Sequence, residues 1–291
     1  MFGESGKFIR RKTVYCDKGK RDLEIELFPM CDFPRARGRR KRYQETSPVQ
    51  RSLNDRRARR FFRRLVKGNF GRGDYSVTLT YRKGFCPADA DEAMRVVRGY
   101  LRRLRGVAKK KNKKFRYILV TEQMQNGNVH HHLLMNGDAG VTRDEAEKLW
   151  HSPQRKGKKQ ESLGLVNCRR IQMDRECGIE GLAQYLAKDP KGRRRWLGSR
   201  NLWRPRVSVS DTAVSRREFR EICLFDEESG RAYAFFEKNY PGYKCLSFAK
   251  EYNAETNLWY VRVVLHRKEP PDGDQGCVAR GDAPVWAEGT D

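Results

Sequence analysis

Three histidines stand in a row at His130, His131 and His132, between the apolar residues Val129 and Leu133. This pattern predicts a β-strand. Side chains of a strand alternate between its two faces, so His130 and His132 share one face and His131 lies on the other. Two imidazoles on one face are a pair of candidate ligands for a divalent metal ion.

A third ligand is expected on the preceding strand, from Phe115 to Glu122, which a hairpin turn at Asn126-Gly127 joins to the histidine strand. A strict two-residue turn would bring Gln123 to the histidine face, whereas a longer loop or a bulge would bring Glu122. Chemistry favours Glu122, because a carboxylate suits Mg²⁺ or Mn²⁺ and supplies charge, but the sequence leaves both open. The candidate metal ligands are therefore His130, His132 and Glu122.

A helix from about Glu176 to Lys188 carries the second candidate group. Tyr185 and Lys188 are neighbours at i, i+3 and project from the side that is not apolar. A phenol attacks phosphorus poorly while protonated, and an adjacent cation both favours phenolate and can hold a phosphate. Tyr185 and Lys188 are the candidate catalytic residues. The alternative is an amphipathic helix with a partly exposed tyrosine. The apolar side of this helix is formed by Ile179, Leu182, Ala183 and Leu186.

The chain is strongly basic, with 63 Lys and Arg against 37 Asp and Glu and a net charge of +26. Such an excess indicates a polyanionic partner, for which nucleic acid is the best candidate. No run of about 18 apolar residues predicts a membrane span, and the N-terminus lacks an apolar secretion signal. The 8 cysteines form no CxxC pair, so reduced thiols in a bacterial cytoplasm are expected rather than a zinc finger.

The order of predicted elements is strand, helix, strand, strand, helix, strand, helix. This order indicates an α+β fold with a central antiparallel sheet flanked by helices, rather than a doubly wound sheet. Asp89 with Glu92, and Thr142 with Glu145, predict two helix starts. The outer strands are expected at Tyr75–Tyr81 and Gly164–Gln172.

Four regions are expected along the chain. Residues 1–50 are predicted to be a basic flexible extension, because Arg35 to Arg42 is a run of repelling cations. Residues 51–205 form the main domain and open with a basic helix at 52–67. Residues 206–266 are expected to be a C-terminal α/β extension with a hairpin at Tyr243–Tyr252 and Leu258–His266. Residues 267–291 are predicted to be an acidic disordered tail.

Taken together, these motifs resemble the HUH endonucleases, specifically the single-tyrosine rolling-circle replication initiators of bacterial plasmids and phages. The first motif is matched by Val77–Tyr81. The metal motif is matched by Glu122 with His130–Leu134, where His131 takes a place that is usually apolar. Tyr185–Lys188 resembles the nucleophile motif, and Ser199–Leu202 resembles a segment that follows it. The resemblance covers about residues 75 to 205.

The resemblance implies a sheet of about five strands and metal-assisted nicking of single-stranded DNA at a replication origin. Tyr185 would become linked to the 5′ phosphate and leave a free 3′-hydroxyl for a host polymerase. No phosphate-binding GxxxxGK[ST] loop occurs, so a host helicase or supercoiling must open the duplex. The alternatives are a relaxase or a single-tyrosine transposase with the same chemistry, and a non-catalytic nucleic-acid-binding protein with a structural histidine cluster.

Overall fold

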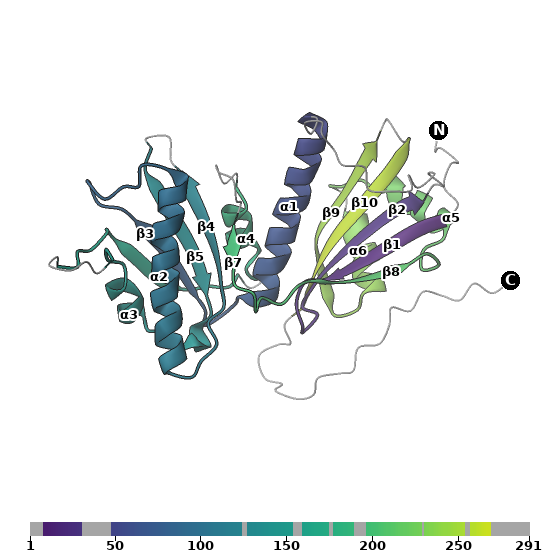
Figure 1. Cartoon of the computed structure of the whole chain (residues 1–291). Coiled ribbons are helices and arrows are strands. Elements are labelled where there is room, and N and C mark those ends of the chain that lie inside the picture. The colour runs from purple at the N-terminus through teal and green to yellow at the C-terminus, as the bar shows by residue number, and fades with distance from the viewer. Residues whose placement is uncertain are drawn as a thin grey trace, which may run out of the picture. The chain divides into compact units, whose positions relative to one another are not determined.

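The structure is a computed structural model that describes residues 8–30, 48–123, 127–153, 159–174, 177–188, 196–228, 230–253 and 257–268. The chain divides into two compact units (Figure 1). Residues Leu53–Trp203 form the first, called here the central unit. The segments Met1–Ser52 and Arg204–Asp291 form the second, called the terminal unit.

The central unit is built on an antiparallel sheet of five strands in the order β6-β3-β5-β4-β7. The predicted central antiparallel sheet flanked by helices is thereby confirmed. Its middle strand β5 is the histidine strand, and its side chains alternate as the sequence predicted. The strands are β3 (Tyr75–Thr80), β4 (Tyr117–Gln123), β5 (Val129–Met135), β6 (Val166–Arg170) and β7 (Leu197–Gly198).

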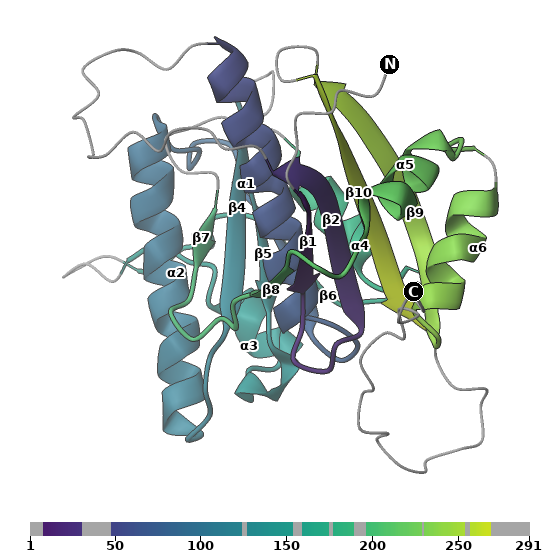
Figure 2. The same ribbon diagram turned by 90° about the vertical axis from the view of Figure 1, so that its right-hand side faces the viewer.

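Helices cover both faces of this sheet. The long helix α2 (Ala90–Lys110) packs on one face, where Tyr100, Leu101 and Leu104 meet Val77 and Leu133. The helices α1 (Pro48–Asn69) and α4 (Glu180–Leu186) contribute to a separate apolar cluster on the other face. Figure 2 shows α2 standing to one side of β4 and β5.

The two predicted helix starts are confirmed by their caps. Asp89 accepts a hydrogen bond of 2.7 Å from the backbone N–H of Glu92 at the start of α2. Thr142 and Glu145 form a reciprocal capping box at the start of the short helix α3 (Arg143–Lys148). Each cap satisfies backbone groups that the first helical turn leaves without partners. A 3₁₀ turn, η1 (Gly137–Ala139), precedes α3.

The terminal unit contains a second antiparallel sheet of five strands, in the order β8-β1-β2-β10-β9. Helices α5 (Arg216–Leu224) and α6 (Gly230–Asn239) share a buried apolar cluster with one face of it, and Figure 2 shows both beside β9 and β10. The predicted hairpin is present as β9 and β10. The strands are β1 (Phe8–Tyr15), β2 (Asp22–Met30), β8 (Arg206–Ser210), β9 (Tyr243–Asn253) and β10 (Leu258–Arg267).

The structure corrects the prediction that residues 1–50 are a flexible extension. Residues 8–30 form two paired strands, and β2 lies between β1 and β10 in the middle of the sheet. Leu23, Ile25 and Leu27 are buried on its inner face. The partner strand β10 lies at the far end of the described chain, so no local pattern reveals this pairing. Residues 206–267 complete the same sheet rather than a separate extension.

Several predicted features lie outside the described residues. These are the basic run Arg35–Arg42, Asn126 of the hairpin turn, and residues 269–291 of the predicted tail. None of the helices in the described ranges is both long and apolar enough to cross a membrane.

Candidate active site

The middle of the central sheet presents His130 and His132 on the face that α4 also covers. In β5, His132 is paired with Thr78 of β3 and Val120 of β4. The Thr78 hydroxyl lies 3.4 Å from Nδ1 of His132, which leaves Nε2 directed elsewhere. His132 is therefore held from one side by β3.

The register of β4 and β5 shows which of the two candidate third ligands lies on the histidine face. Gln123 pairs with Val129 and Glu122 pairs with His130, so the connection is longer than a two-residue turn. Glu122 lies on the histidine face, and its Oε2 is 3.2 Å from Nε2 of His132. The alternative, Gln123 on that face, does not occur.

His131 is a core residue on the opposite face, as the alternation predicted. It is fully buried, and its two ring nitrogens lie 2.9 Å from the Tyr81 hydroxyl and 2.9 Å from Thr121 Oγ1. A neutral imidazole satisfies both, since one nitrogen accepts and the other donates. Burial, with smaller repulsion from His132 and His130, lowers the pKa of His131 to about 3. It therefore stays neutral at physiological pH.

Tyr185 projects from α4 toward the histidine face. Its ring meets the His132 ring edge to face, with 5.8 Å between the ring centroids and 88° between the planes. The side chain is 47 % exposed, although Ala183 and Leu186 of the same helix are buried. Lys188 follows the helix and places Nζ 4.8 Å from the centre of the Tyr185 ring. The structure thus brings the predicted nucleophile, its cation and one predicted metal ligand together.

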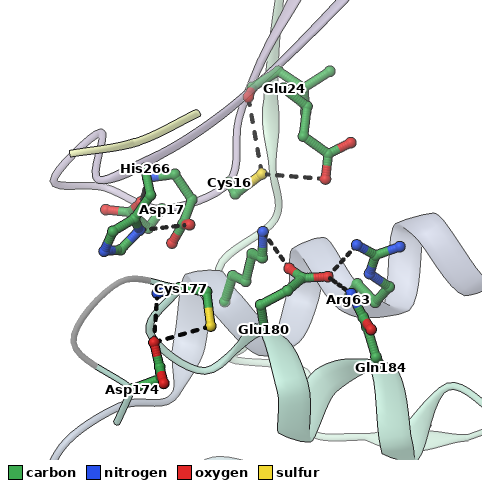
Figure 3. A network of polar contacts seen from close by, with 12 residues as sticks. Cys16, Asp17, Glu24, Arg63, Asp174, Cys177, Glu180, Gln184 and His266 are labelled. Atoms are coloured by element: carbon green, nitrogen blue, oxygen red, sulfur yellow. Dashed lines mark hydrogen bonds and ion pairs between the residues drawn. The ribbon is translucent and has the colours of Figure 1, made fainter. Parts of the chain in front are cut away.

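A buried ion cluster anchors the helix that carries Tyr185. Glu180, at the first position of α4, is paired with Arg63 and Lys67 of α1, and it accepts a hydrogen bond of 3.0 Å from Gln184. Figure 3 shows Arg63 and Gln184 converging on Glu180. Burial alone would raise the pKa of Glu180, but Lys67 and Arg63 hold it below its usual value.

The sequence does not predict this cluster. In the basic helix predicted at 52–67, Arg63 and Lys67 point inward, and the Lys67 side chain is only 1 % exposed. No sequence pattern indicates it, because at 100° per residue Glu180 lies about 110° from the centre of the apolar side of its helix, as far away as Tyr185. The identity of its partners depends on how α1 and α4 pack, which the sequence does not give.

The segment after α4 closes the edge of the sheet. Leu197 and Gly198 pair with β4, and the Ser199 hydroxyl accepts a hydrogen bond of 3.1 Å from the Tyr117 N–H. Trp196 packs on α1, 5.3 Å from the ring of Phe62. Trp196 is thereby part of the apolar packing between the sheet and α1.

The donor set suits a hard divalent ion. Adjacent ligands of an octahedral Mg²⁺, with bonds of about 2.1 Å, lie about 3 Å apart, close to the 3.2 Å between His132 Nε2 and Glu122 Oε2. His130 pairs with Glu122 across the two strands and is therefore the third candidate ligand. Across the described ranges, no three His, Cys, Asp or Glu side chains are arranged so that they could hold an ion. The geometry thus provides a fitting donor pair with a third candidate beside it.

Comparison with known protein families gives a match over part of the chain. Residues 74–190 match the model of a family described as replication-associated protein ORF2. The match contains all five candidate residues and supports a rolling-circle-initiator type of protein with a role in DNA replication. No curated protein and no solved structure matches the chain.

Proposed function

We propose that the protein is a single-stranded DNA nicking-joining endonuclease of the HUH type that initiates rolling-circle replication of a plasmid or phage. One observation carries this proposal: the Tyr185 ring lies against His132, and Nε2 of His132 lies 3.2 Å from the Glu122 carboxylate. A nucleophile, an imidazole and a carboxylate therefore meet on one sheet face. The match over residues 74–190 supports the replication role.

The proposed cofactor is Mg²⁺ or Mn²⁺, held by His130, His132 and Glu122. When bound, such an ion polarises the scissile phosphate and neutralises its charge. Side chains of the protein position the reacting groups. Thr78 fixes the His132 ring, and the Glu180 cluster fixes the helix that aims Tyr185. The Lys188 ammonium lies over the phenol ring, where it would attract a phosphate beside Tyr185.

In the proposed reaction, the Tyr185 oxygen attacks phosphorus as the phenol loses its proton. The bond from phosphorus to the 3′ oxygen breaks, and that oxygen leaves as a hydroxyl. One phosphodiester replaces another, so the 5′-phosphotyrosine retains the energy needed to rejoin a later 3′-hydroxyl. The free 3′ end would prime a host polymerase, and a host helicase would open the duplex.

The test is covalent adduct formation on labelled single-stranded oligonucleotides from the cognate replicon, with Mn²⁺ or with EDTA. We expect an adduct that depends on the ion, maps to Tyr185 and disappears in Tyr185→Phe. Tyr252→Phe is the matched control, because Tyr252 is 45 % exposed and lies in the terminal unit. An adduct that persists in Tyr185→Phe would refute the assignment.

A second candidate is a non-catalytic nucleic-acid-binding protein. It is favoured by the lack, within the described residues, of three converging ligand side chains. It predicts tight, salt-sensitive binding with no adduct under any metal condition. A relaxase or a single-tyrosine transposase would share the adduct chemistry. They would differ in the DNA sequence that is cut.

A further inference from the structure

The exposed side of α2 carries a stripe of five cations. Arg95, Arg98, Arg102, Arg105 and Lys109 are all exposed and follow one another at alternating intervals of three and four residues. At 3.6 residues per turn, they fall within an arc of about 80° and extend over about 21 Å. In the described structure, none of the five has an acidic partner. The arginine stripe, as we call it, is therefore a continuous line of positive charge.

Two cations beside the stripe, Arg103 of α2 and the C-cap residue Lys111, behave differently. Arg103 donates to the backbone oxygens of Leu149 and His151, each at 3.0 Å. Lys111 is bound to Glu145 at 2.8 Å. These two side chains hold α2 to the segment around α3, whereas the stripe contributes nothing of this kind to the fold.

The stripe destabilises its own helix. Like charges at i, i+3 and i, i+4 repel each other, and four such pairs follow in succession along the stripe. Since no carboxylate among the described residues relieves this repulsion, an external polyanion is the partner that would. Proteins bind the DNA backbone through such lines of Lys and Arg.

Two glycines beside the stripe give an independent indication. Gly99 and Gly106 are interior to α2, where glycine disfavours helix relative to alanine. Packing does not explain them: a Cβ at Gly106 would meet nothing within 4 Å, and one at Gly99 would meet only the flexible end of Arg103. On the helical wheel both lie next to Arg95 and Arg102. They leave a shallow strip where a phosphate backbone can approach the helix closely.

We propose that the arginine stripe of α2 is a second DNA-binding surface, which takes the phosphate backbone of duplex DNA. Duplex is favoured over single strands because single-strand sites combine charge with aromatic stacking, and Tyr100, the only aromatic residue of α2, is fully buried. The surface is separate from the candidate active site. Helix α2 packs on the sheet face opposite His132 and Tyr185, so a short oligonucleotide in that site leaves the stripe free.

The test compares two full-length variants of equal charge. One carries Arg98→Gln, Arg102→Gln, Arg105→Gln and Lys109→Gln, which preserve helix propensity. The control carries Arg217→Gln, Arg220→Gln, Arg231→Gln and Lys238→Gln, at exposed positions of α5 and α6. The affinity for a duplex without origin sequence is measured against NaCl concentration.

We expect the stripe variant to flatten the plot of log affinity against log salt by about 3 to 4, because each phosphate contact contributes about 0.9. The control should keep the parental slope. Gly106→Leu should also weaken duplex binding, although it favours the helix. Adduct formation on a short single-stranded oligonucleotide should be unchanged in all three variants. Equal loss in the control, or loss confined to single-stranded DNA, would overturn the proposal, whether or not Tyr185 proves to be the nucleophile.

Discussion

The rings of Tyr185 and His132 stand perpendicular to each other, with 5.8 Å between their centroids. They come from different elements, a helix and the middle strand of the sheet, which are separated by α3 and β6 along the chain. The arrangement depends on α4 packing on the same face that carries His130 and His132. The site therefore depends both on the reacting side chains and on the contacts that hold α4 in place.

Glu122→Gln removes the carboxylate from the histidine face while keeping its size. We expect DNA nicking to fall by about 100-fold or more, as when one charge-stabilising group is removed from an active site. The free energy of unfolding should hardly change, since Glu122 is partly exposed. Nicking rates at saturating Mn²⁺ measure the effect.

Gln123→Ala is the matched control for this variant. Gln123 is the next residue along the strand, but it pairs with Val129 and lies on the other face. Its nicking rate should remain at the parental level. Equal losses in the two variants would show that β4 as a whole, rather than the Glu122 carboxylate, supports the activity.

The site shows where sequence reasoning succeeds and where it stops. The alternation of His130, His131 and His132 is a property of any strand, so their division between faces could be predicted. The choice between Glu122 and Gln123 could not, because a change of one residue in loop length exchanges the two faces. The sequence pattern also predicts too early a start for α4. Asp174 and Gly178 form a backbone-paired turn, so the helix begins at Glu180.

In the terminal unit, the local sequence pattern predicts the wrong structure. Residues 8–30 carry many charges, including Arg10, Arg11 and Lys12, and a local reading favours an extension. Two of these charges are satisfied across the sheet: Arg10 binds Asp211 and Lys12 binds Glu26. A partner as distant as Asp211, 201 residues after Arg10, leaves no mark on local composition or periodicity.

Removal of residues 1–47 should therefore unfold the terminal unit. The deletion takes away β1 and the middle strand β2, and with them the buried residues Ile9, Leu23, Ile25 and Leu27. The central unit retains its whole sheet and should stay folded. Hydrogen exchange of the truncated protein checks this: protection should persist in β3 to β6 and vanish in β9 and β10. Retained protection in β9 and β10 would contradict the expectation.

Lys67→Met should destabilise the central unit by about 3 kcal/mol, because the buried Oε2 of Glu180 loses its partner and an unsatisfied buried acceptor that carries charge is costly. Arg57→Met, on the exposed side of the same helix, should change stability by less than about 0.5 kcal/mol. Urea unfolding midpoints measure both. The double variant Lys67→Met/Glu180→Met should recover part of the loss, and no recovery would refute the pairing as its cause.

The same cluster makes the central unit sensitive to acid. The folded-state pKa of Glu180 is lowered, so this carboxylate contributes stability above its ordinary unfolded pKa of about 4.5 and loses that contribution as the pH falls further. Comparing unfolding midpoints of the parent and the double variant at pH 6 and pH 3.5 isolates this effect. The parent should lose more stability than the variant.

A separate loss of stability is expected at milder pH from His131. Its pKa is about 3 in the folded protein and about 6.5 in an unfolded chain. Between these values the unfolded state binds the extra proton, so stability falls as the pH is lowered through 6.5 and is fully present above it. At pH 5 the loss is about 2 kcal/mol. His131→Gln can still bond to Tyr81 and Thr121 but does not titrate. It should be less stable than the parent at pH 7.5 and should lose less stability between pH 7.5 and pH 5. Equal losses in the two proteins would mean that His131 is not the titrating group.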